Sequence, residues 1–180
     1  MHYTGTIWRP PYEAYSLLVQ VTAGCTHHSC KFCTLYEDLP FKFKLSPFSE
    51  VKADLAEASK YYRKISRIFF TGANPFVLST EKLKTLAKMV KEYYPFYKTI
   101  GCFARITDIM PKSLEELKEL RALGYDGITI GVVTGDDESL TFMNKGFQSK
   151  DVLEQCRKLD EAGISYNFFY LTGIYGAGRG

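Results

Sequence analysis

The chain has 180 residues, of which 46% are hydrophobic and 24% charged, and its formal net charge is +3 at pH 7. These values are typical of one globular domain that is large enough for a sizeable core. No apolar run is long enough to span a bilayer and no apolar signal segment opens the chain, so we expect a cytoplasmic protein without a membrane partner.

The first expected strand is the apolar run Tyr15–Gly24, which follows an N-terminal extension over residues 1–14. A loop over residues 24–36 comes next and contains three of the five cysteines, with the spacing C-x4-C-x2-C: Cys25, Cys30 and Cys33. Without a secretory signal, these cysteines argue against a disulfide framework and favour metal or redox use.

Three thiolates leave one position of a metal centre without a protein ligand. An open position of this kind is where metal chemistry occurs, whereas closed sites are usually structural. From the spacing alone, three interpretations stay open: an iron–sulfur cluster, a zinc site completed by His27 or His28, or no metal.

Helices and strands then alternate along the chain. The expected elements are a helix from Ser46-Pro47, a strand at Ile65–Thr71, a helix at Thr80–Tyr94, a strand at Thr99–Ala104, a helix from Ser113 to Gly124, a strand at Gly127–Gly131, helices at Asp136–Asn144 and Ser149–Ala162, and a strand at Ser165–Leu171. We expect Ser46 to cap its helix, Ser113 and Glu116 to form a capping box, and Gly163 to end the last helix.

Strands separated by helices imply a parallel sheet with right-handed crossovers, and therefore an α/β fold, either a full or partial barrel or a doubly wound sheet. In such folds the active site lies at the carboxyl ends of the strands. These ends carry the cysteine loop and four polar or glycine-rich segments: Gly72–Asn74, Arg105–Asp108, Gly131–Gly135 and Gly173–Gly178.

The three cysteines after a first strand, with Phe32 immediately before the third, resemble the radical S-adenosylmethionine (radical SAM) superfamily. The first gap is one residue longer than in the commonest motif of that family. Further segments are similar to the branch that contains oxygen-independent coproporphyrinogen oxidase and the elongator catalytic subunit: Arg105–Asp108, Asn144–Gly146 and Glu161–Ile164. The Arg9–Pro11 segment resembles the start of uncharacterised radical enzymes of this kind.

The resemblance implies a (β/α)6 TIM-like barrel whose three loop cysteines bind a [4Fe-4S] cluster. It also implies reductive cleavage of S-adenosylmethionine (SAM) to a 5′-deoxyadenosyl radical that acts on an unidentified substrate, with an electron donor such as flavodoxin or ferredoxin. The cofactor contacts that it implies are Phe32, Gly72, Ala73, Asn74, Arg105, Gly131, Thr134 and Gly173. Among them, Arg105 is expected to pair with the methionine carboxylate.

Only five strands precede Gly180, so we expect residues 1–180 to be a radical SAM core that lacks its sixth βα unit. The alternative from another class is a zinc-stabilised α/β binding module without catalysis. Nucleic acid as a partner is neither supported nor excluded, because the basic excess of residues 1–98 lacks the aromatic spacing of a known RNA-binding module.

Overall fold

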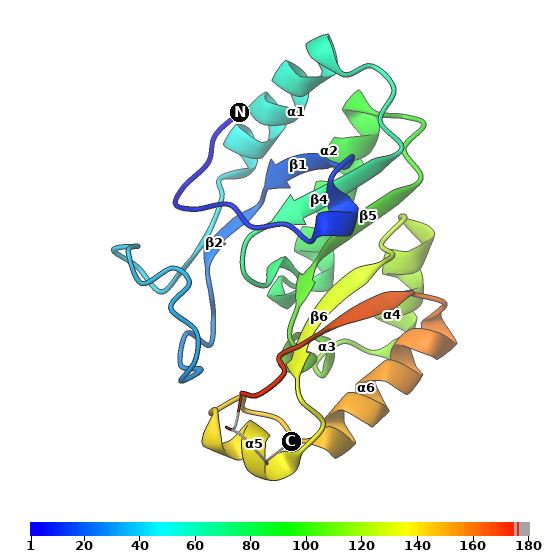
Figure 1. Cartoon of the computed structure of the whole chain (residues 1–180). Helices are drawn as coiled ribbons and strands as arrows, with labels where there is room; N and C mark the ends of the chain where they lie inside the picture. The colour runs from blue at the N-terminus through cyan, green and yellow to red at the C-terminus, as the bar shows by residue number, and fades with distance from the viewer. Residues whose placement is uncertain (175, 177–180) are drawn as a thin grey trace.

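The computed structural model describes residues 1–174 and residue 176. Five parallel strands form one sheet in the order β1-β4-β5-β6-β7 (Figure 1). They are β1 (Leu17–Gln20), β4 (Arg67–Thr71), β5 (Thr99–Ala104), β6 (Ile128–Val133) and β7 (Tyr166–Tyr170). All neighbouring pairs are parallel, which confirms the expected α/β class. The spatial order follows the chain order, as in the wall of a partial TIM-like barrel.

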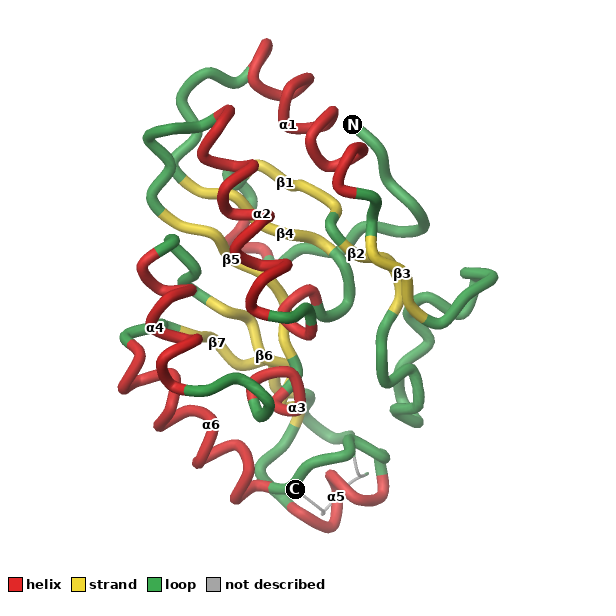
Figure 2. Tube along the Cα trace, turned by 180° about the vertical axis from the view of Figure 1, so that it is seen from behind, coloured by secondary structure: helices red, strands yellow, loops and turns green. Residues whose placement is uncertain are grey.

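Helices cover one face of this sheet, as Figure 2 shows from behind. The helices on this face include α1 (Phe48–Tyr61), α2 (Thr80–Tyr93), α4 (Leu114–Ala122) and α6 (Ser149–Ala162). The short helices α3 (Ile106–Ile109) and α5 (Asp137–Phe142) follow β5 and β6, and α5 lies beyond the end of the sheet. Two 3-10 turns, η1 (Pro11–Glu13) and η2 (Pro75–Val77), complete the elements. Alternate strand residues such as Ile68 and Phe70 pack against the apolar stripes of these helices to form the core. Among the described residues, no helix is both long and apolar enough to cross a membrane.

The N-terminal segment, residues 1–16, starts beside α1, where Met1 and His2 contact Glu57 and Asp54, and then crosses the opposite face of the sheet in front of β1 and β4 (Figure 1). Its Glu13 is 1% exposed and accepts two hydrogen bonds from Nε of Arg67, at 2.9 and 2.8 Å. The Tyr12 hydroxyl lies 2.8 Å from Oγ1 of Thr129 on β6. Tyr12 and Glu13 therefore pack on this inner face of the sheet near the amino ends of β4 and β6.

The apolar run at Tyr15–Gly24 is not one strand, as the sequence predicted, but two. After Gln20 the chain leaves the sheet, and β2 (Thr22–Gly24) pairs antiparallel with β3 (Phe43–Leu45), a strand that the sequence analysis missed. Periodicity cannot reveal this change of partner, because both halves of the run are apolar and buried.

One expected helix cap is wrong and two others are confirmed. Pro47, not Ser46, is the N-cap of α1, and the Ser46 hydroxyl lies 3.2 Å from Nε2 of His2 instead. The capping box of α4 is present in both directions, at 3.1 and 2.8 Å. Gly163 ends α6 in the left-handed conformation, with φ of 72°.

Candidate cofactor site

The cysteine loop lies in the connection between the paired strands β2 and β3, at one end of the sheet. The backbone N–H of Cys25 donates to the carbonyl of Lys42 at 2.9 Å, so the two ends of the loop are held together. Gly24 has φ of 74°, and a Cβ there would lie 2.3 Å from that same carbonyl oxygen. Only glycine therefore allows the ribbon to close directly before the first cysteine.

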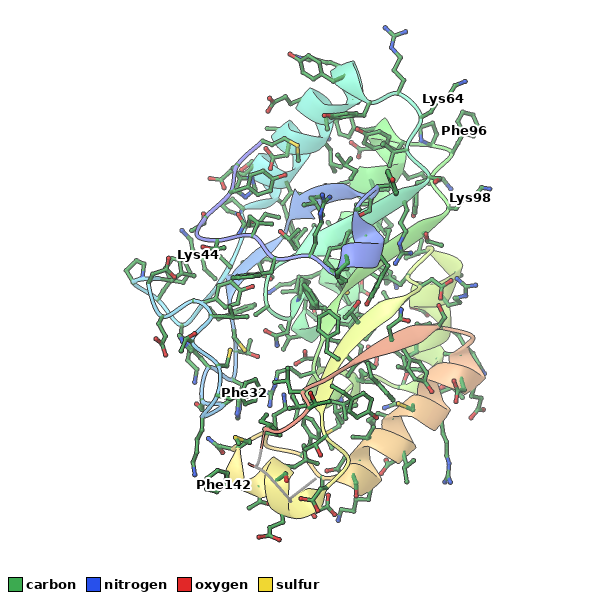
Figure 3. The ribbon with its side chains drawn as sticks, in the orientation of Figure 1. Phe32, Lys44, Lys64, Phe96, Lys98 and Phe142 are labelled. Atoms are coloured by element: carbon green, nitrogen blue, oxygen red, sulfur yellow. The ribbon has the colours of Figure 1, made fainter. Side chains whose placement is uncertain are left out.

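The three loop cysteines are free, half-buried and line one cavity of about 350 Å³. A turn in which the N–H of Cys33 donates to the carbonyl of Cys30 at 3.1 Å brings the last two close together. Figure 3 labels Phe32 in this loop, near the end of the molecule where α5 carries Phe142. Most of the remaining cavity wall is apolar or aromatic, including Trp8, Phe103 and Phe169.

Seven of the eleven predicted site residues line this cavity: Cys25, Cys30, Phe32, Cys33, Ala73, Arg105 and Gly131. They come from the cysteine loop and from the carboxyl ends of β4, β5 and β6. The other four lie outside its lining: Gly72, Asn74, Thr134 and Gly173. The convergence of these strand ends is therefore confirmed, whereas the individual cofactor contacts stay predictions.

Gly72 and Asn74 have structural contacts of their own. A Cβ on Gly72 would lie 2.0 Å from Oγ1 of Thr22, so this glycine allows β4 and β2 to approach closely. Asn74 is fully buried, and its amide donates to Thr26 and to both carboxylate oxygens of Asp108, at 2.7 to 3.1 Å. Its side-chain oxygen accepts from the N–H of Thr26 at 3.3 Å.

Thr134 and Gly173 are also placed away from the cavity wall. Oγ1 of Thr134 accepts from the N–H of Asp136 at 3.2 Å, while the preceding Val133 lines the cavity. Gly173 lies in the turn after β7, and a Cβ there would meet nothing within 4 Å. The glycine-rich stretch that begins at this residue lies partly outside the described residues.

Arg105, directly after β5, is held in place with part of its hydrogen-bonding capacity unused. One terminal nitrogen donates to Oγ1 of Thr107 at 2.9 Å and the other to the backbone carbonyl of Lys145. Its Nε is buried and has no partner among the described residues. A buried donor without an acceptor is costly, so this nitrogen fits a ligand that brings an acceptor into the cavity.

Lys145 is a cavity residue to which the sequence analysis assigned no role. It is 5% exposed and lines the same cavity as the cysteines. Burial lowers its pKa, and the charge of Cys30 opposes this shift. Burial likewise raises the pKa of the Cys30 thiol, and the positive charges of Lys145 and Arg105 oppose this rise. The buried Lys145 and the half-buried Arg105 therefore oppose, without reversing, the effect of burial on the Cys30 thiol.

His27 has a fixed role within the protein. Its Nε2 donates to the carbonyl of Asn144 at 2.6 Å, so that nitrogen carries a proton and cannot bind a metal. Over the described part of the chain, no group of three or more His, Cys, Asp or Glu side chains is arranged to hold a single metal ion.

The family model of the radical SAM superfamily matches residues 19–178. The chain therefore belongs to the radical SAM superfamily, whose cofactors are a [4Fe-4S] cluster and SAM. The described cavity fits these groups, because it contains free thiols, the buried cation of Lys145 and the unpaired Nε donor of Arg105.

Individual relatives are similar over part of their length. The heme chaperone HemW of Bacillus subtilis is 29% identical over 100 residues, which are 56% of this chain and 26% of HemW. The chain thus spans about a quarter of that curated relative.

Solved structures agree with the fold. The radical SAM methyltransferase TsrM from Kitasatospora setae, with cobalamin and a [4Fe-4S] cluster bound, has a TM-score of 0.67 at 17% identity, over 88% of this chain and 31% of TsrM. Coproporphyrinogen III oxidase (HemN) from Escherichia coli has a TM-score of 0.60 at 19% identity, over 88% of this chain and 37% of HemN.

Proposed function

We propose that this chain is the cofactor-binding core of a radical SAM enzyme, in which Cys25, Cys30 and Cys33 hold the [4Fe-4S] cluster. The observation that carries the proposal is that three free, half-buried thiols line one cavity together with the buried Lys145 and the half-buried Arg105. An external electron donor such as flavodoxin or ferredoxin and an unidentified substrate complete the reaction.

When bound, the cluster and SAM supply a one-electron cleavage of the sulfonium carbon–sulfur bond, which yields an organic radical that abstracts hydrogen. The chain's own residues hold and shield these groups. Phe32 and the other rings of the cavity would exclude water from the bound cofactors. Arg105 offers its unpaired Nε and its charge to the methionine carboxylate. Ala73 and Gly131 carry little or no side chain and so leave room for the cofactor.

The first test is cofactor loading and cleavage by the protein reconstituted without oxygen. We expect about four irons and four sulfides per chain. After reduction with dithionite, the protein is expected to release 5′-deoxyadenosine from SAM. Cys30→Ala should abolish this release, because the two thiolates that remain, Cys25 and Cys33, are too few to hold the cluster. The matched control is Cys156→Ala, since Cys156 lies on α6 outside the cysteine loop. It should retain both iron and cleavage.

The same measurements separate the proposed function from the zinc alternative. A colourless protein with one zinc per chain, whose loss unfolds it, would contradict the radical SAM assignment. Release of 5′-deoxyadenosine by Cys30→Ala at the level of the unmodified protein would contradict the assignment of the cluster ligands.

A further inference from the structure

The turn after α5 is fastened to the cysteine loop by three hydrogen bonds. The N–H of Lys31 donates to the carbonyl of Met143 at 3.1 Å. Nε2 of His27 donates to the carbonyl of Asn144 at 2.6 Å, and the side-chain amide of Asn144 donates to the carbonyl of Ser29 at 2.9 Å. These contacts join segments that are more than 100 residues apart in the chain, so they define where the turn lies relative to the three cysteines.

The backbone of this turn also determines the position of Lys145. Asn144 and Gly146, on either side of it, have φ of 55° and 78°. Left-handed conformations at two such positions give the turn a well-defined shape. The carbonyl of Lys145 in turn accepts a hydrogen bond from the guanidinium of Arg105. The main chain of Lys145 is therefore held from two sides, and its side chain lines the cavity.

The ammonium group of Lys145 contacts two aromatic rings, at 5.6 Å from the ring centre of Phe32 and 5.5 Å from that of Phe147. The residue is 5% exposed. Within the described part of the chain, its Nζ has no carboxylate or carbonyl partner, whereas other lysines with low exposure, such as Lys112, donate to backbone carbonyls. Cation–π contacts of this kind offset only part of the cost of removing an ammonium from water.

A buried cation without a counterion favours binding of an anion. The titratable groups that act on Lys145 across the cavity are the three cysteines and a second cation, Arg105, which adds to the positive charge of the site. Three thiolates outweigh the positive charge of an oxidised four-iron core, and reduction adds another negative charge. We propose that Lys145 is the fixed counterion of the iron–sulfur cluster, held against it by the turn at residues 143–146. This inference rests on the proposed function and makes Lys145 a positioning and electrostatic residue.

A fixed cation stabilises the reduced, more negative cluster more than the oxidised one, so it raises the reduction potential. Lys145→Met removes the charge but keeps a long apolar side chain. In the reconstituted protein without SAM, we expect its cluster to have a lower midpoint potential in an anaerobic redox titration followed by electron paramagnetic resonance. At a fixed solution potential, we expect the ratio of reduced to oxidised cluster to fall tenfold or more. This corresponds to a midpoint potential that is lower by at least about 59 mV for a one-electron couple.

The matched control is Lys31→Met, which makes the same change of charge in the cysteine loop. Lys31 is exposed, with its ammonium 4.4 Å from the ring centre of Phe142, so water screens its charge. Its variant should shift the potential by much less than Lys145→Met does. Equal shifts in the two variants would overturn the proposal, because the effect would then reflect net charge alone.

Two further measurements keep the test decisive. If Lys145→Met fails to load iron, Lys145→Arg should restore loading, because it keeps the charge; failure of both variants would overturn the role as counterion. An unchanged potential in Lys145→Met together with weaker binding of SAM would also overturn it, and would assign Lys145 to the methionine carboxylate. A protein that loads no cluster with Lys145 intact would contradict the proposed function itself.

Discussion

Asp108 is a buried carboxyl group in the short helix α3, next to the cavity. It is 2% exposed and accepts hydrogen bonds from the amide of Asn74 and from the N–H of Arg105, the latter at 2.7 Å. Burial raises its pKa from 3.8 to about 6, and these two hydrogen bonds limit the rise. Between these two values, the folded protein therefore binds a proton that the unfolded chain has already lost.

The stability of the cofactor-free protein should depend on pH through this group. A carboxyl whose folded pKa is raised costs stability as pH rises, so its contribution falls between pH 3.8 and about 6. Asp108→Asn does not titrate. We expect the free energy of unfolding of this variant, relative to the unmodified protein, to increase by up to about 3 kcal/mol across this window. Urea unfolding at several pH values measures it, and a constant difference would contradict the assignment.

At the scale of single helices, α2 and α4 offer a matched pair of N-caps. Ser113 caps α4 by accepting from the N–H of Glu116, while Ser79 is the N-cap of α2 but makes no capping hydrogen bond. Ser113→Ala should lower the free energy of unfolding by about 1 kcal/mol, and Ser79→Ala should change it much less. Urea midpoints of the two variants test this, and equal losses would show that the observed capping bond contributes nothing.

The main elements could be predicted from local patterns. The strand Thr99–Ala104 and the helix Ser149–Ala162 have the predicted bounds, because their alternation, stripes and caps lie within the element itself. The β2–β3 ribbon and the capping of α1 could not be predicted in this way. Both depend on contacts with distant segments, such as the 3.2 Å contact between His2 and Ser46.

For the site, too, local patterns could be predicted and contacts between distant segments could not. The spacing of the three loop cysteines predicted a metal site, and the carboxyl ends of the expected strands predicted its location. The environment of Lys145 could not be predicted, because it depends on Phe32 and Phe147 and on a turn fastened to the cysteine loop. Likewise, no local pattern shows that the amide of Asn74 is taken by Thr26 and Asp108. The resemblance named Asn74 as a cofactor contact and included Lys145 only within the segment Asn144–Gly146, and it indicated the partners of neither.

For the molecule as a whole, the contact between Glu13 and Arg67 fastens the N-terminal segment to the sheet. Glu13 is almost fully buried, and Arg67 also donates to Oγ1 of Thr99 at 2.9 Å. Arg67→Met should lower the free energy of unfolding by about 3 kcal/mol or more, because it leaves a buried carboxylate without its cation. The double variant Glu13→Gln/Arg67→Met should recover much of this loss. No recovery in chemical unfolding would contradict the role of the pair.

The contacts between the cysteine loop and the turn after α5 also constrain the order of assembly. Asn144 contacts His27 and Ser29 across separations of 117 and 115 residues. Contacts this distant form slowly, since a long stretch of chain must first come together. On the ribosome, the loop thus emerges well before the turn that holds it. If the three cysteines bind the cluster as proposed, iron that reached the nascent chain would meet a loop without its final constraints, so metallation would follow the synthesis and docking of β6 and α5.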